Sequence, residues 1–206
     1  MTDAEHPQIY LVTPPAFEIV PFIDRLAAVL DAHPVACLRV AMASGDEYTV
    51  ASSADACREA AHARDVAVVI ERHVGLVGRL GLDGVHLADG ARGVRAARKD
   101  LGPDAIVGAF CGTSRHDGMS AGEAGADYVA FGPVGQTALG SGTQAEREIF
   151  EWWSEMIELP VVAEGALDAA AVASLAPVSD FLAFGEEIWR EEDAGAALAL
   201  LTAAMR

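Results

Sequence analysis

The sequence predicts an α/β fold, a (β/α)8 TIM barrel that forms one domain over residues 1–206, from three observations. Short apolar segments alternate with alanine-rich helical segments from one end of the chain to the other. Regular alternation of this kind implies right-handed βαβ units and a parallel sheet. The length of 206 residues lies near the lower size limit of an eightfold barrel. Eight units in this length favour a closed barrel over an open sheet, and no linker divides the chain.

The strands are predicted from runs of β-branched and aromatic residues that lack the polar alternation of a surface strand. This composition is typical of strands buried on both faces of a parallel sheet. The expected strands are Ile9–Thr13, Val35–Val40, Val66–Ile70, Gly84–Leu87, Ala105–Ala109, Tyr128–Phe131, Val161–Glu164 and Phe181–Phe184.

Helical segments separate these strands. Ser53 is expected to cap a helix that begins at Ala54, and Pro21 suits the first turn of the first helix. The expected helices include Glu18–Ala32, Ala54–Ala63, Ala91–Lys99, Gln144–Ile157, Leu167–Leu175 and Asp193–Met205. Glycines such as Gly108, Gly132, Gly165 and Gly185 follow the strands, at the barrel end where active sites form.

Composition and charge exclude several classes of protein. Hydrophobic residues make up 52% of the chain, enough for a large core, and no apolar run approaches the roughly 20 residues that span a bilayer. The acidic N-terminal residues lack the positive charge of a secretory signal, so a cytoplasmic location is expected. The three cysteines form no CxxC pair and support neither a disulfide framework nor a zinc site. The net charge of −17 makes nucleic acid and anionic membranes improbable partners.

Three stretches of the chain resemble the thiamine phosphate synthase and thiazole tautomerase superfamily. They read LDGVHL at residues 82–87, GADYVAFGPV at residues 125–134 with Thr137 after it, and PVVA at residues 160–163. Their order and spacing agree with that family over essentially the whole chain, and the central block is the most specific. The resemblance implies an enzyme that joins a pyrimidine pyrophosphate to a thiazole phosphate, with Mg²⁺ holding the pyrophosphate. Charge stabilisation of the leaving group and positioning are then the main catalytic tasks.

The resemblance assigns Arg39 to the pyrophosphate, because it stands at the family's arginine on the second strand. The flanking glutamine and lysine of the family are Cys37 and Ala41 here. Arg72 replaces a family aspartate and could supply positive charge, since a guanidinium binds phosphate oxygens in a bidentate way. We therefore assign Arg39 and Arg72 as the candidate catalytic residues. The alternatives are a structural ion pair of Arg39 with Glu71 and a solvated loop arginine at Arg72.

The metal ligands of the family are missing. Glu71 and Arg72 stand where the family has Asn-Asp, and Asp89 lies two residues ahead of the second metal aspartate. Mg²⁺ needs oxygen ligands and is fixed by carboxylates. No metal site and no cofactor are therefore assigned, although the family implies Mg²⁺. Whether Glu71 or Asp89 substitutes for the lost carboxylates stays open.

The phosphate half of the site is better preserved. Barrels of this type commonly bind phosphate on glycine N–H groups in their last loops. The candidate phosphate-binding residues are Gly132, Thr137, Gly165, Gly185 and, at the family's serine after the fifth strand, Cys111. Glu164 opposes this assignment, since a carboxylate there repels a phosphate unless it is paired or protonated. A conformational role of the glycines, a buried thiol at Cys111 and a hydrogen-bonded barrel histidine at His86 are the structural alternatives.

The resulting interpretation is a thiamine-phosphate-synthase-like protein of thiamine biosynthesis with a degenerate active site, a transferase if it is active. The alternatives are a non-catalytic phosphate-ligand-binding or regulatory barrel and a tautomerase-like activity on a thiazole phosphate. The expected partner is a small phosphorylated heterocycle of the thiazole phosphate kind. A homo-oligomer is compatible with the sequence.

Overall fold

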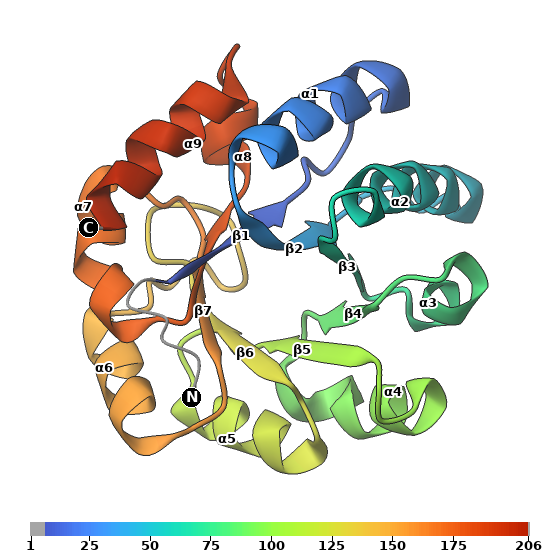
Figure 1. Ribbon diagram of the computed structural model, residues 1–206. Helices are drawn as coiled ribbons and strands as arrows, with labels where there is room; N and C mark the ends of the chain where they lie inside the picture. The colour runs from blue at the N-terminus through green and yellow to red at the C-terminus, as the bar shows by residue number, and fades with distance from the viewer. Residues whose placement is uncertain (1–6, 206) are drawn as a thin grey trace.

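Eight parallel strands close into a barrel, and helices surround it in a computed structural model that describes residues 7–205 (Figure 1). The strands pair in sequence order, β1 to β8, and β8 returns to β1. The strands are β1 Gln8–Val12, β2 Val35–Val40, β3 Ala67–Glu71, β4 Gly84–Leu87, β5 Ile106–Phe110, β6 Tyr128–Phe131, β7 Val161–Glu164 and β8 Phe181–Phe184. The predicted fold class is confirmed.

The helices follow the strands on the outside of the barrel. The α-helices are α1 Ile19–Ala32, α2 Glu47–His62, α3 Val74–Leu80, α4 Val94–Leu101, α5 Arg115–Ala124, α6 Arg147–Met156, α7 Ala169–Leu175, α8 Glu186–Trp189 and α9 Ala194–Thr202. Short 3₁₀ turns are η1 Gly90–Gly93, η2 Ala176–Val178 and η3 Ala203–Met205. None of the described helices is long and apolar enough to cross a membrane.

The predicted start of the second helix is wrong. Helix α2 begins at Glu47, and its cap is Asp46, whose side chain accepts a hydrogen bond from the Thr49 N–H group. Ser53 lies inside the helix and is 1% exposed, so it cannot cap a helix end. Pro21 does lie in the first turn of α1, as expected.

Two apolar clusters follow from the alternation of side chains along each strand. Residues such as Leu11, Leu38 and Ile70 point outward and pack against the helices. Residues of the opposite parity form a smaller cluster among Tyr10, Cys37, Val69, Phe110, Tyr128, Ala130, Val162 and Ala183. That second cluster fills the barrel interior and forms the floor beneath the loops at the carboxyl ends of the strands.

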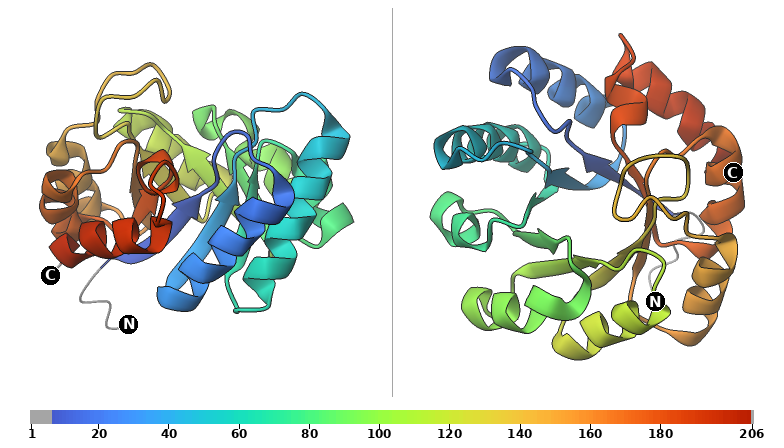
Figure 2. Two further views of the ribbon diagram at one scale, coloured as in Figure 1. Left: turned by 90° about the horizontal axis from the view of Figure 1, so that it is seen from above. Right: turned by 180° about the vertical axis from the view of Figure 1, so that it is seen from behind.

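The longest of these loops, residues 132–146 between β6 and α6, arches over one end of the barrel (Figure 2). Its residue Leu139 packs against the interior cluster. The carboxyl ends of the strands and this loop together enclose the candidate site.

Candidate functional site

The barrel interior holds three buried polar side chains near the carboxyl ends of their strands. Arg39, His86 and Glu164 are 4%, 1% and 2% exposed. Their side chains point into the barrel. Arg39 lies beside Val69 and Glu164 beside Ala183 in the strand register, and both neighbours belong to the interior cluster. A buried polar group is costly unless it is hydrogen-bonded, so their contacts define the site.

Arg39 is bonded to two partners across the barrel. Its Nη2 atom donates to Glu164 Oε2 at 2.6 Å, and its Nη1 atom donates to His86 Nε2 at 2.7 Å. Glu71 lies farther away, with 4.0 Å between its Oε2 atom and Arg39 Nε. The structural partner expected for Arg39 was Glu71, but the close partner is Glu164.

His86 continues this network as the expected hydrogen-bonded barrel histidine. Because its Nε2 atom accepts from Arg39, the ring proton lies on Nδ1 and is donated to Tyr128 Oη at 2.9 Å. The Tyr128 hydroxyl in turn meets that of Tyr10 at 2.7 Å. Gly108 makes room for this arrangement, since a Cβ atom there would lie 2.0 Å from the Tyr128 ring. The network fixes the orientation of the Arg39 guanidinium.

Burial and charge set the protonation of these groups. Burial is the largest single influence on Arg39 and lowers its pKa, but the charges of Glu164, Tyr10, Tyr128 and Glu71 together outweigh burial and leave the Arg39 pKa raised. Burial raises the pKa of Glu164 above its ordinary value, against the opposing charge of Arg39. Burial, followed by the charge of Arg39, lowers the pKa of His86 well below its ordinary value, so this imidazole stays neutral.

Glu71 and Arg72 form a second ion pair at the end of β3. Arg72 Nη2 lies 2.9 Å from Glu71 Oε1, and the Arg72 side chain is 70% exposed. Arg72 is therefore largely solvated, as its structural alternative stated, and is in addition paired with Glu71, which the sequence did not predict.

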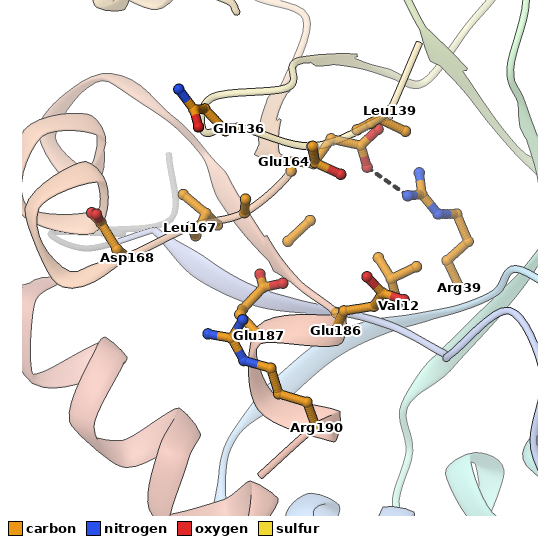
Figure 3. A pocket seen from close by; sticks show the side chains of 15 residues that line it. Val12, Arg39, Gln136, Leu139, Glu164, Leu167, Asp168, Glu186, Glu187 and Arg190 are labelled. Carbon is orange, nitrogen blue, oxygen red and sulfur yellow. Dashed lines mark hydrogen bonds and ion pairs between the residues drawn. The ribbon is translucent and has the colours of Figure 1, made fainter. Parts of the chain in front are cut away.

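A first cavity of about 320 Å³ opens above β7 and β8. Figure 3 shows Arg39 and Glu164 joined on one side of it, and Glu186, Glu187 and Arg190 from the start of α8 and beyond on another. Thr137, Gly165 and Gly185 also line it. Gly165 has φ of 96°, a conformation that favours glycine, and a Cβ atom there would lie 2.8 Å from Pro133.

A second cavity of about 340 Å³ lies on the β3 and β4 side of the barrel end. Arg72, Glu71 and His86 line it. Arg39, Glu164 and Leu139 line both cavities, so this trio forms their common wall. Each cavity also has a second arginine of its own, Arg190 in the first and Arg72 in the second.

The structure brings together most of the residues assigned from the sequence. Arg39, Thr137, Gly165 and Gly185 line the first cavity, and Arg39 and Arg72 line the second. Gly132 and Cys111 are both buried and are not lining residues of either cavity. Burial raises the pKa of the Cys111 thiol to about 12. That thiol points to the Ala109 carbonyl oxygen, 3.6 Å away, as a buried structural thiol would.

Sequence reasoning missed Glu186, Glu187 and Arg190, which border the first cavity. A signal for them existed, because they directly follow Gly185 at the end of the last strand, where barrel active sites form. Burial raises the pKa of Glu187, while the backbone N–H groups of Glu187, Gly185 and Leu167 oppose this shift. The first cavity thus combines four carboxylates, Glu164, Asp168, Glu186 and Glu187, with two guanidinium groups, Arg39 and Arg190.

The side chains at this end of the barrel do not fit a bound Mg²⁺. Within residues 7–205, no group of three or more His, Cys, Asp or Glu side chains is arranged to hold a metal ion. Glu71 is paired with Arg72, and Asp89 is exposed and does not line either cavity. A metal cation bound so close to the guanidinium groups would also be repelled by them. The second cavity is lined by two carboxylates, Glu71 and Glu164, each paired with an arginine, and does not offer the set of oxygen ligands that a metal ion needs.

Comparison with known proteins gives one consistent family. The model of the family described as thiamine monophosphate synthase matches residues 9–184. A thiamine-phosphate synthase of Rhodospirillum centenum is 41% identical over 191 residues, which cover 92% of this chain and 91% of that protein. A thiamine-phosphate synthase of Hyphomonas neptunium is 38% identical over 208 residues, which cover 96% of this chain and 94% of that protein.

Solved structures agree on the fold. A thiamine phosphate pyrophosphorylase from Pyrococcus furiosus superposes with a TM-score of 0.82 at 20% identity, over 96% of this chain and 95% of that chain. A 3-hexulose-6-phosphate synthase superposes with a TM-score of 0.70 at 14% identity, over 96% of this chain and 99% of that chain. Both are barrels that resemble this one in architecture.

Proposed function

The chain belongs to the thiamine monophosphate synthase family and is a protein of thiamine biosynthesis, and from this premise we propose that it joins a pyrimidine pyrophosphate to a thiazole phosphate. The observation that supports this most is the pair of adjoining cavities at the barrel end, which have Arg39 in their common wall. A reaction between two phosphorylated heterocycles needs two neighbouring sites, each with positive charge for its phosphate groups.

The second cavity suits the pyrophosphate. Arg39 and Arg72 both line it, and guanidinium groups bind phosphate oxygens through paired N–H donors. When the bond to the leaving pyrophosphate breaks, its negative charge grows, and the two arginines stabilise that charge. The first cavity then receives the monophosphate of the partner heterocycle, with Arg190 and the loops of Thr137, Gly165 and Gly185 around it.

No step of this proposal uses a metal ion, because the donor set at the barrel end does not fit Mg²⁺. Both ligands are therefore expected to bind equally well with and without Mg²⁺. Isothermal titration calorimetry with each compound tests this point. Binding that appears only when Mg²⁺ is added would show that Glu71 or Asp89 substitutes for the missing ligands.

A second candidate function is a binding barrel that has lost catalysis. One observation favours it: the Arg39 guanidinium, which the reaction needs, is already bonded to Glu164 and His86. A pyrophosphate must compete with the Glu164 carboxylate at 2.6 Å before it can use this arginine. If that competition fails, the barrel still binds the monophosphate but does not react.

Complementation of a thiamine auxotroph that lacks its thiamine phosphate synthase separates the two candidates. Growth with the wild-type chain supports the synthase, and loss of growth with an Arg39→Ala chain that is still expressed and folded supports the role of Arg39. Arg95→Ala is the matched control, because Arg95 is exposed on α4 and does not line either cavity. No growth from a chain that is expressed, folded and binds the thiazole phosphate would establish the binding barrel instead.

A further inference from the structure

The buried pair of Arg39 and Glu164 is joined by a single hydrogen bond and leaves one polar atom unused on each side. Glu164 Oε2 accepts from Arg39 Nη2 at 2.6 Å. Arg39 Nε and Glu164 Oε1 are both buried, and neither meets a hydrogen-bond partner within residues 7–205. A guanidinium and a carboxylate can form two parallel bonds, and a buried polar atom without a partner is costly. The pair is therefore suited to change its hydrogen bonds when an anion arrives.

The unused Nε atom of Arg39 is the donor available to a ligand in the second cavity. Glu71 Oε2, which is 4.0 Å from this atom, belongs to that cavity. Nε and Nη2 form one edge of the guanidinium, and such an edge binds two phosphate oxygens at once. A pyrophosphate on this edge shares Nη2 with Glu164 Oε2, while Nη1 keeps its bond to His86 Nε2. Two anions then lie beside one buried cation.

The two carboxylates of the second cavity must respond differently to a bound pyrophosphate. Glu71 is 21% exposed and its partner Arg72 is 70% exposed, so the Glu71 carboxylate can turn toward water. Glu164 is 2% exposed and has no such route. A buried group that is placed beside a like charge becomes neutral by changing its protonation. Glu164 is therefore expected to take a proton on its unused Oε1 atom, while Oε2 still accepts from Arg39.

The other titratable and charged groups around Glu164 leave it as the acceptor of this proton. They are Tyr10 on β1, Arg39 on β2, Glu71 on β3 and Arg72 after it, His86 on β4, Tyr128 on β6, Asp168 before α7, Glu186 and Glu187 on α8, and Arg190 after it. Burial raises the pKa of both tyrosines, and burial followed by Arg39 lowers the pKa of His86, so all three stay neutral. Burial raises the pKa of Glu164 against the opposing charge of Arg39, and a pyrophosphate on Arg39 weakens that opposition.

We propose that Glu164 is a positioning residue that takes up a proton when a pyrophosphate binds Arg39 and returns the proton to solvent when the pyrophosphate leaves. The proposed function places the pyrophosphate in the second cavity, and this inference rests on it. The first cavity reaches Glu164 from the other side and gives the proton a route from solvent (Figure 3). Neutral Glu164 leaves the charge of Arg39 to the pyrophosphate. Ionised Glu164 competes for that charge again and favours release of the product.

The test counts protons by calorimetry on the full chain, with inorganic pyrophosphate as the ligand and two buffers of different ionisation enthalpy. In Glu164→Gln the amide oxygen keeps the bond from Arg39, but no carboxylate titrates. The wild type is expected to take up about one proton more than this variant, and the difference cancels protons that belong to the pyrophosphate itself. Above the pKa of Glu164 in the free chain, the affinity of the wild type relative to the variant should fall by up to about tenfold per pH unit.

Two matched variants identify the group that takes the proton. Glu71→Gln removes the other carboxylate of the second cavity, and it should bind pyrophosphate more tightly but still take up the proton. His86→Gln removes the other buried group that is bonded to Arg39, and its proton uptake should also equal that of the wild type. Uptake that persists in Glu164→Gln, or that vanishes in either matched variant, would overturn the inference.

Infrared difference spectroscopy keeps the inference testable if Glu164→Gln does not fold. Addition of pyrophosphate to the wild-type chain should produce the C=O stretching band of a protonated carboxyl group, and this band should shift in D₂O. The same band should appear in Glu71→Gln, which assigns it to a carboxyl group other than Glu71. Absence of the band from the wild-type chain saturated with pyrophosphate would contradict protonation of Glu164.

Complementation of the thiamine auxotroph separates this inference from the proposed function. Growth with the wild-type chain, combined with pyrophosphate binding that takes up no proton on Glu164, would refute the inference and leave the synthase standing. Proton uptake on Glu164 without growth would support the inference and count against the synthase. If the wild type binds no pyrophosphate between pH of about 6 and about 8, the inference is wrong, whatever the result of complementation.

Discussion

Arg39 and Glu164 meet inside the barrel from β2 and β7, with 2.6 Å between Arg39 Nη2 and Glu164 Oε2 and with both side chains at most 5% exposed. The pair forms the common wall of the two cavities. Removing two charges from water is costly, and the attraction between them must repay that cost through good geometry and further hydrogen bonds. Here His86 supplies one such bond. The same two groups therefore affect both the stability of the barrel and the binding of anions.

Removing one partner of the Arg39–Glu164 pair should lower the stability of the fold far more than replacing both partners. Glu164→Ala leaves the Arg39 charge buried and is expected to lower the free energy of unfolding by about 3–5 kcal/mol. The double variant Arg39→Met with Glu164→Leu should recover most of that loss, because apolar residues of similar volume replace the pair. Urea unfolding measures both. Glu155→Ala, at an exposed position on α6, is the control and should change stability by less than about 0.5 kcal/mol. A mild effect of Glu164→Ala would contradict the ion pair.

Stability should fall as the pH drops below the ordinary pKa of histidine, about 6.5. Burial and then Arg39 lower the pKa of His86 in the folded chain, so the unfolded chain binds more protons below that pH. Neutral His86 contributes fully to the free energy of unfolding above a pH of about 6.5. As the pH falls from there toward the pKa of His86 in the folded chain, this contribution decreases by about 1.4 kcal/mol per pH unit. Urea unfolding at several pH values measures the slope. His86→Gln should reduce it, whereas His116→Asn, at an exposed position, should keep it.

Alternation and apolar runs were sufficient to predict the barrel. Five of the eight strands, β2, β4, β6, β7 and β8, have the predicted bounds, because buried parallel strands are continuous apolar runs. About the first two turns of α2, from Glu47 to Ser53, were missed. Glu47, Tyr48 and Thr49 are exposed, and Asp46 caps the helix ahead of its buried residues. The helices α3, α5 and α8 lie outside the helix ranges named from the sequence, because glycines interrupt α3 and α5 and α8 has only 4 residues.

The site was predictable only in part. Arg39, Thr137, Gly165 and Gly185 could be assigned because each occupies a position of a known family pattern. The ion-pair partner of Arg39 could not be assigned from the sequence, because Glu71 and Glu164 both lie at strand ends. Only the closed barrel shows which of the two is nearer to Arg39. Glu164 was recognised as unfavourable for phosphate unless paired, and the structure provides that pairing. The place of Arg190 beside the first cavity depends on the turn of α8, which no periodicity in the sequence indicates.

The three cysteines should be unreactive in the folded chain. Cys37, Cys57 and Cys111 are buried free thiols, and burial raises the pKa of each to about 12. Because the thiolate is the reactive form, Ellman's reagent at a pH of about 8 should label none of them until the chain is unfolded. Full labelling in denaturant is the control. Rapid labelling of one native thiol, removed by Cys111→Ser, would instead place Cys111 within reach of ligands.

Arg190 offers the most direct test of the anion site in the first cavity. Its side chain is 72% exposed and its contact with Glu191 is 3.4 Å long, so it can turn toward a bound phosphate at little cost. Exposed ion pairs contribute up to about 1 kcal/mol, so Arg190→Ala should weaken binding of the monophosphate roughly threefold to fivefold. Added salt should reduce the difference, because exposed charges are screened. Calorimetry at two salt concentrations measures both effects, and Arg95→Ala on α4 should bind as the wild type does. If Arg190→Ala binds the monophosphate as tightly as the wild type, the phosphate does not approach α8. Of the two guanidinium groups that line this cavity, only that of Arg39 would then be left to bind an anion.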